Sequence, residues 1–156
     1  MARVDYLHDP NAPAANSLCP AVSVFIQDKQ DRILMIRRTD NDKYAIPGGQ
    51  QEIGETLAQA AVREVKEETG IDVAIVGLVG LYSNPAHVIA YDDGEVRQEF
   101  SICFRAHPTG GELQTSDESK EVHWIAASRT SELDVHPSIR LRIQHGLEHR
   151  DEPYFT

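Results

Sequence analysis

The segment from Pro47 to Ile71 constrains this chain more than any other, because it joins a glycine-rich turn to a run of strong helix formers. It reads PGGQQEIGETLAQAAVREVKEETGI. Thr56 and Gln59 are spaced as a capping box, which starts a helix by satisfying its first free backbone amides. Gly70 can end that helix in a left-handed turn. The segment therefore predicts a helix from about residue 57 to 69.

The same helix carries an unusual set of carboxylates. With about 3.6 residues per turn, Glu64, Glu67 and Glu68 fall on one flank, beside an apolar flank that can pack into the protein. Like charges at this spacing repel one another, and a bound hard cation reverses that repulsion. A merely solvated acidic face is the alternative, and the adjoining glycine-rich loop argues against it. Because the ligands are all oxygen, we expect a site for Mg²⁺ or Mn²⁺ rather than Zn²⁺.

The spacing of this segment resembles the signature of the Nudix hydrolases, the MutT-like proteins. That signature is G-x5-E-x7-R-E-U-x-E-E-x-G-U, where U is a bulky aliphatic residue, and every specified position matches. The matching residues are Gly49, Glu55, Arg63, Glu64, Val65, Glu67, Glu68, Gly70 and Ile71. The resemblance extends over roughly residues 21 to 149 and implies the Nudix fold, an α/β/α sandwich around a mixed β-sheet.

The resemblance also implies an enzyme, a Nudix pyrophosphohydrolase in which water attacks one phosphorus of a pyrophosphate linkage. A divalent cation, Mg²⁺ or alternatively Mn²⁺, neutralises the phosphate oxygens in such enzymes. The implied metal ligands are the backbone carbonyl of Gly48 and the carboxylates of Glu64, Glu67 and Glu68. The implied catalytic residues are Glu64 as the general base, Glu55 as the fourth acid of the signature, and Arg63, which can brace a carboxylate through two hydrogen bonds.

Further functional residues must lie outside the signature. Some Nudix enzymes take an extra base or metal ligand from a later loop, and Glu118 or Glu121 would be that residue here, although an acid before a strand is ordinarily solvated. The candidate substrate contacts, which are of types that stack on a base or pair with a phosphate, are Tyr44, His87, Tyr91 and Arg97. Each has a structural alternative: a core or rim position for the tyrosines, a strand face for the histidine, and cross-strand pairing for the arginine.

The sequence leaves the substrate open. ADP-ribose or a nucleotide sugar is one possibility, and a non-standard or oxidised (d)NTP is the other. Pro85 lies fourteen residues after Ile71, where it resembles a proline of ADP-ribose pyrophosphatases, but a proline at a strand end ordinarily just terminates pairing. A different class also stays open, a nucleotide-sensing module that has the Nudix fold without the chemistry. Retention of all three signature glutamates favours the enzyme.

Composition narrows the partners and the compartment. A formal charge of −10 disfavours a nucleic-acid polymer as a partner, because binding its phosphates requires Lys and Arg. A small nucleotide substrate is still compatible with this charge, because a bound metal ion can offset the local acids. Cys19 and Cys103 lie outside any metal-ligand pattern, so we expect free thiols in a reducing compartment. We see no signal peptide and no apolar run of membrane-spanning length, and we expect a cytoplasmic protein without a membrane partner. On the resemblance alone, a homodimer is compatible.

The remaining segments predict how the chain is organised. At 156 residues the chain has the length of one domain. We expect residues 1 to 17 to be a loosely ordered arm and residues 18 to 156 to be the Nudix domain. The predicted elements are a hairpin of 21–27 and 32–38, a short extended piece at 44–46, a strand after the helix from 71, a second hairpin turning at Asp93-Gly94, a strand at 121–127 and a closing amphipathic helix over 137–149.

Overall fold

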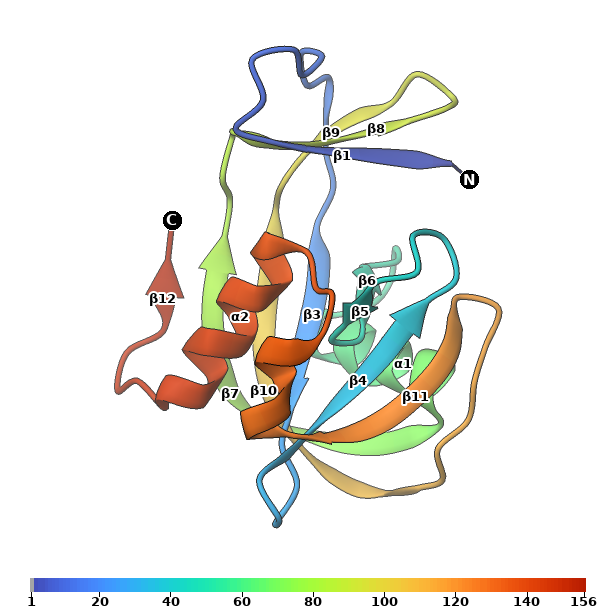
Figure 1. The fold of residues 1–156 in the computed structure, drawn as a ribbon, viewed down its shortest axis with the longest axis vertical. Coiled ribbons are helices and arrows are strands. Elements are labelled where there is room, and N and C mark those ends of the chain that lie inside the picture. The colour runs from blue at the N-terminus through green and yellow to red at the C-terminus, as the bar shows by residue number, and fades with distance from the viewer. Residues whose placement is uncertain (1) are drawn as a thin grey trace.

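The computed structural model describes residues 2 to 156. Its elements, in chain order, are β1 (Arg3–Leu7), β2 (Ser17–Leu18), β3 (Ala21–Ile26), β4 (Arg32–Arg38), β5 (Tyr44–Ala45), β6 (Gly48–Gln50), α1 (Leu57–Thr69), β7 (Ile71–Tyr82), β8 (His87–Tyr91), β9 (Val96–Gln98), β10 (Ser101–Gly111), β11 (Ser119–Ala126), the 3₁₀ helix η1 (Ala127–Glu132), α2 (Pro137–Glu148) and β12 (Tyr154–Phe155). Figure 1 shows the two α-helices on either side of the long central strands. This layered arrangement confirms the predicted α/β/α class.

The strands form three sheets. The central one has the order β12-β7-β10-β3-β6, and it is mixed because β10 pairs parallel with β3 and antiparallel with β7. A second sheet has the order β11-β4-β5, and a third, at the end of the molecule where the N-terminus lies, has the order β1-β8-β9-β2 (Figure 1). The third sheet stands beyond the upper ends of the central strands and gives the molecule its elongated shape.

Strand β3 shows why a central strand can be apolar at almost every position. Val22, Val24 and Ile26 pack in one buried cluster, which also contains residues of α1. Phe25, between them, packs in a second buried cluster, to which α2 contributes Ile143. Successive side chains of a strand point to opposite faces, so a strand covered by a helix on each side needs apolar residues at consecutive positions.

The predicted hairpin of β3 and β4 is wrong beyond its turn. One antiparallel bridge, Gln27 to Ile33, joins the two segments, and the strands then part into different sheets. Each edge of β3 is occupied, by β10 and β6, and each edge of β4 is occupied, by β11 and β5. A strand has two hydrogen-bonding edges, so these long-range partners exclude pairing between β3 and β4.

The signature helix follows its sequence signals closely. The side chain of Thr56 accepts a hydrogen bond from the amide of Gln59 at 3.1 Å, and the side chain of Gln59 accepts one from the amide of Thr56 at 2.9 Å. Gly70 ends the helix with φ of 78°, and its amide donates to the carbonyl of Lys66. The predicted capping box, left-handed end and bounds of 57 to 69 are all confirmed.

Other predicted elements vary in their agreement with the structure. Strands β8 and β9 form the expected hairpin around Asp93-Gly94, and α2 covers nearly all of the predicted closing helix. The prediction of a loosely ordered arm differs from the structure at residues 3 to 7. These residues form β1, which pairs antiparallel with β8 along its whole length. Met1, also part of that arm, lies outside the described residues. A short sequence cannot reveal a partner strand about eighty positions away, since pairing depends on both strands.

Two expectations about the chain as a whole can be compared with the structure. Cys19 and Cys103 are free thiols, as predicted. Within residues 2 to 156, neither helix has the length and apolar character that crossing a membrane requires.

The contact between α2 and β3 gives a test of the packing. A Cβ added at Gly146 would lie 2.5 Å from the ring of Phe25, so we expect Gly146→Ala to lower the free energy of unfolding by about 1–3 kcal/mol. Urea denaturation measures this loss. The matched control is Gly77→Ala in β7, where an added Cβ meets nothing within 4 Å. Because alanine ordinarily stabilises a helix relative to glycine, an unchanged or raised stability of Gly146→Ala would contradict this packing.

Candidate active site

The glycine turn and α1 meet at unusually close range. Strand β6 pairs with β3 so that a Cβ at Gly48 would lie 2.2 Å from the carbonyl oxygen of Val22. A Cβ at Gly49 would lie 2.4 Å from the carboxyl group of Glu64. Only glycine permits such approaches. The Glu64 carboxyl group therefore lies directly against the backbone of the turn, at a position that the turn itself fixes.

Arg63 joins the signature carboxylates to one another. Its Nε donates to Glu55 at 2.5 Å and its Nη2 to the other oxygen of Glu55 at 3.0 Å, which makes a two-point contact. Its Nη1 donates to Glu64 at 2.8 Å and to Glu67 at 3.1 Å. The contact with Arg63, and then the backbone amide of Glu52, lower the pKa of Glu55. One guanidinium thus partly neutralises three carboxylates and fixes their directions.

Glu68 is a buried acid that has no ion-pair partner among the described residues. It is 4% exposed, and its Oε2 has no hydrogen-bond partner. Burial, and then the neighbouring charge of Glu64, raise the pKa of Glu68 to about 9. Burial also raises the pKa of Glu64, although Arg63 opposes the effect. Two buried acids whose charged forms are disfavoured fit a divalent cation, which supplies the missing positive charge and accepts oxygen ligands.

The three glutamates are not gathered into a closed ligand set. Among the described residues, the group with three potential ligand atoms within 4.8 Å of one another is Asp5, His87 and His136, not the acids of α1. Glu67 is largely exposed, with 58% of its side chain accessible, whereas Glu64 and Glu68 are buried. A cation bound by all three would therefore draw Glu67 inward.

A cleft of about 720 Å³ connects α1 to the N-terminal sheet. The predicted residues that line it are Tyr44, Gly48, Arg63, Glu64, Glu67, His87, Tyr91, Arg97 and Glu118. Glu121 does not line it. Its carboxylate instead pairs with Arg37 at 2.8 Å and with His123 at 3.2 Å. The structure thus brings all four candidate substrate contacts into the same cleft as Glu64 and Glu67, whereas Glu55 and Glu68 do not line it.

Arg97 and Tyr91 form one wall of this cleft. The Arg97 guanidinium lies over the Tyr91 ring at 4.7 Å, donates to the Tyr91 hydroxyl at 3.2 Å, and pairs with Glu95. In the amide orientation that satisfies both its oxygen and its nitrogen, the side-chain oxygen of Gln50 accepts a hydrogen bond from Arg97 at 2.8 Å. Because the backbone carbonyl of Gln50 accepts from Arg63 at 3.0 Å, this residue links the wall to α1. Arg97 thus lines the cleft, as a substrate contact would, and it also contacts Tyr91 across the strand pair of β8 and β9.

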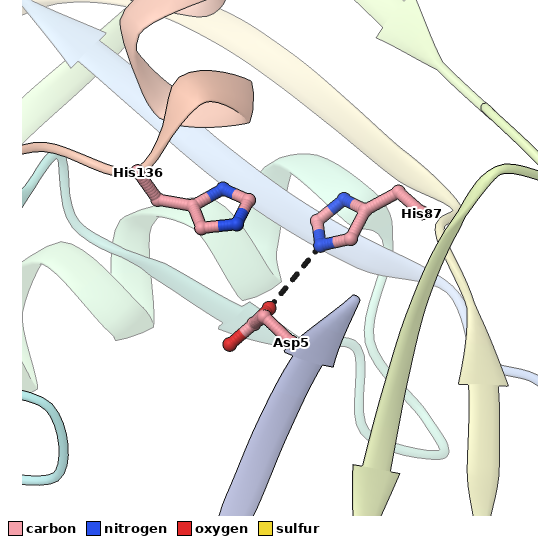
Figure 2. A group of neighbouring side chains, drawn as sticks. All are labelled: Asp5, His87 and His136. Carbon is pink, nitrogen blue, oxygen red and sulfur yellow. Dashed lines mark hydrogen bonds and ion pairs between the residues drawn. The ribbon is translucent and has the colours of Figure 1, made fainter. Parts of the chain in front are cut away.

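His87 is buried between two acids rather than exposed on a strand face. Its Nδ1 lies 3.1 Å from Glu99 and its Nε2 lies 3.2 Å from Asp5, while its ring stacks on His136 with centroids 5.0 Å apart (Figure 2). Burial lowers the pKa of His87, but the hydrogen bonds with Asp5 and Glu99 outweigh it and the net pKa is raised. Sequence reasoning missed Asp5, Glu99 and His136, since no local pattern connects them.

Comparisons with known proteins identify the family. A family model described as the NUDIX domain matches residues 17 to 143, so the chain belongs to the NUDIX family. It is 38% identical over 125 residues to an ADP-ribose pyrophosphatase of Methanocaldococcus jannaschii, covering 74% of this chain and 68% of the relative. It is 36% identical to a MutT-like protein of Streptomyces ambofaciens, covering 81% and 77%. It is 30% identical to an 8-oxo-dGDP phosphatase of Danio rerio, covering 89% of this chain but 41% of the relative.

Solved structures agree on the fold. A NUDIX hydrolase from Nitrosomonas europaea matches 90% of this chain and 77% of its own, with a TM-score of 0.71 and 24% identity. A UDP-X diphosphatase matches 94% of this chain and 71% of its own, with a TM-score of 0.68 and 17% identity. The protein is a Nudix hydrolase, and the predicted family, fold and enzyme class are confirmed. Hydrolases of this family generally depend on a divalent metal.

The close approach of Gly49 to Glu64 gives a test of the site. Because the clashing atoms are the mobile end of a side chain, we expect Gly49→Ala to fold but to displace the Glu64 carboxyl group, with a loss of kcat of about a hundredfold. Steady-state hydrolysis measures the loss, and thermal unfolding verifies the fold. Gly77→Ala is the matched control and should keep full activity. Full activity of folded Gly49→Ala would show that the position of Glu64 does not matter.

Proposed function

We propose that this hydrolase cleaves the pyrophosphate linkage of a nucleoside diphosphate derivative, with ADP-ribose or a related nucleotide sugar as substrate and Mg²⁺, or Mn²⁺ in its place, as the cation. The observation that carries the proposal is the buried pair of Glu64 and Glu68 beside the glycine turn of the 720 Å³ cleft, with Glu68 Oε2 lacking a partner. This is a charge arrangement that a cation and a phosphate chain together complete.

The residues that would hold the cation are Gly48 through its carbonyl, Glu64, Glu67 and Glu68. When bound, the cation neutralises phosphate oxygens and makes water more acidic. Arg63 directs Glu64 and Glu67 toward it. Glu55, whose two oxygens accept from Arg63 and from the amide of Glu52, acts as a positioning residue for Arg63 in this scheme. The fourth acid of the signature then contributes through Arg63 rather than by touching the substrate.

Glu64 is the proposed general base. One of its oxygens accepts from Arg63, which leaves the other free to take a proton from the attacking water. Glu118 is the proposed additional ligand or base, because it lines the cleft and its charge raises the pKa of both Glu64 and Glu68. Glu121 is the weaker candidate, since Arg37 and His123 already occupy its carboxylate.

The extent of the cleft supports a substrate with groups on both sides of the pyrophosphate. It runs from α1 to Tyr91 and Arg97, where a base or sugar can stack. The relative from M. jannaschii is named for ADP-ribose, which favours that substrate first. An oxidised nucleotide is the second candidate, because another relative is named for 8-oxo-dGDP. Pro85 gives no support to either, since it lines a separate hollow with residues of the N-terminal loop.

The oligomeric state and the compartment remain predictions. A homodimer and a cytoplasmic location are both compatible with the family resemblance. Small nucleotide derivatives are the partners that the relatives' names indicate, and the net charge of −10 continues to argue against a nucleic-acid polymer.

The metal assignment predicts a strong effect of neutral substitution. Glu67→Gln should lower kcat by about a hundredfold or more and leave the fold unchanged, because Glu67 is exposed and its loss removes a ligand rather than packing. Chelation of divalent cations should abolish the wild-type activity, and added Mg²⁺ should restore it. Steady-state assays measure both effects. Glu132→Gln, a similarly exposed acid outside the cleft, is the matched control, and wild-type rates for Glu67→Gln would refute the assignment.

Product analysis separates the candidate substrates. ADP-ribose hydrolysed at its pyrophosphate gives AMP and ribose 5-phosphate, whereas an oxidised dNTP gives a monophosphate and pyrophosphate. We expect the largest kcat/KM for ADP-ribose in a panel that also contains UDP-glucose, 8-oxo-dGDP and 8-oxo-dGTP. If 8-oxo-dGTP is hydrolysed efficiently while ADP-ribose is inert, the second candidate replaces the first. Tight binding across the panel without hydrolysis would instead favour a sensor.

A further inference from the structure

A second group of potential metal ligands lies in the same cleft, outside the signature. We propose that Asp5, His87 and His136 form a separate cation site that takes a transition ion such as Zn²⁺. One ligand atom from each residue lies within 4.8 Å of the others. Figure 2 shows the two imidazole rings and the carboxylate facing a common space. Two imidazoles and a carboxylate are a ligand set of the kind that binds transition metals.

The three residues come from separate parts of the chain. Asp5 lies on β1, His87 begins β8, and His136 is the N-cap of α2. His87 is 4% exposed, so its approach to Asp5 is imposed by the packing of these elements and not by two mobile surface side chains meeting. An ion held by all three would tie the N-terminal strand to α2 across the cleft.

Neighbouring groups fix the direction of each imidazole. The Nδ1 of His87 faces Glu99, and Glu99 is itself held by Arg142 at 3.0 Å and by the amide of Asn84 at 3.0 Å. A histidine whose Nδ1 donates to a carboxylate presents Nε2 as the ligand atom, which is the usual orientation around a bound metal. The Nδ1 of His136 lies 2.8 Å from the hydroxyl of Ser138 and accepts from the amide of Ser138 at 3.2 Å, so the neutral ring carries its proton on Nε2. Metal binding at Nε2 therefore requires that proton to move to Nδ1, where the hydroxyl of Ser138 can accept it.

The local charges are balanced before any ion binds, because Arg3 pairs with Asp5 at 2.7 Å and Arg142 pairs with Glu99. An ion would therefore be held by its bonds to the ligand atoms and not by surplus negative charge. A carboxylate oxygen has more than one lone pair, so Asp5 can accept from Arg3 and still bind a metal. An ion would replace the proton between His87 Nε2 and Asp5 Oδ1, which lie 3.2 Å apart.

Ligand chemistry separates this site from the acids of α1. Oxygen-only ligands favour Mg²⁺, whereas imidazole nitrogen favours Zn²⁺ and its transition-metal neighbours. The proposed Zn²⁺ site is therefore independent of the proposed function, and its test measures metal binding rather than hydrolysis. Either proposal can fail while the other holds.

Zn²⁺ binding in excess Mg²⁺ tests the proposal on the full chain, because Mg²⁺ then occupies oxygen sites. Isothermal titration should show one Zn²⁺ per chain, and Zn²⁺ should raise the Tm. His136→Asn should weaken Zn²⁺ binding at least about tenfold while preserving the start of α2, since asparagine is a good N-cap. His123→Asn, an exposed histidine of β11 outside the cleft, is the matched control and should bind as wild type does.

Three outcomes would overturn the site. The first is absence of Zn²⁺ binding in excess Mg²⁺, which would leave Asp5, His87 and His136 as a hydrogen-bonded contact only. The second is equal affinity in wild type and His136→Asn. The third is binding that survives His136→Asn but is lost in Glu67→Gln, which would place the ion on α1. Because His136→Asn alters one partly buried residue and keeps the cap, its Tm without Zn²⁺ verifies that it folds.

Discussion

The contacts of Arg63 hold the acidic site together. Without this guanidinium, Glu55, Glu64 and Glu67 would face one another as uncompensated charges around a short helix and a tight turn. With it, each carboxylate has a fixed direction, and the turn is bonded to α1 through the carbonyl of Gln50. Lysine could not replace it, because an ammonium group lacks the planar fork that serves several acceptors at once.

Glu68 is placed by a different principle. It is buried against the turn rather than paired with an arginine, and the protein holds it with a raised pKa and an unpartnered oxygen. Such an arrangement costs stability in the absence of a cation, and it is retained where function requires it. The site therefore combines one acid set that Arg63 partly neutralises with one buried acid that has no basic partner among the described residues.

Local signals predicted the elements whose structure is decided locally. The capping box at Thr56, the left-handed end at Gly70 and the hairpin turn at Gly94 depend on neighbours within a few positions, and all agree with the structure. The β3–β4 hairpin failed because its strands find better partners far away in sequence. A turn signal indicates where the chain reverses, but it does not say whether the strands remain together afterwards.

The same distinction applies to the site. The signature acids are recognisable because they share one helix, where spacing alone puts them on one flank. His87 and Arg97 were recognisable only by residue type, and their partners Asp5 and Gln50 come from other strands. The joining of these segments depends on the pairing of β1 with β8 and of β6 with β3, which no short stretch specifies.

Strand β3 has a further consequence, since it contacts both the glycine turn and α2. Phe25 packs in one cluster with Ile143 of α2, the amide of Val24 bonds to the carbonyl of Pro47 at 2.9 Å, and Ser23 pairs with Gly48. A shift of α2 would thus reach the turn through three consecutive contacts on a rigid strand.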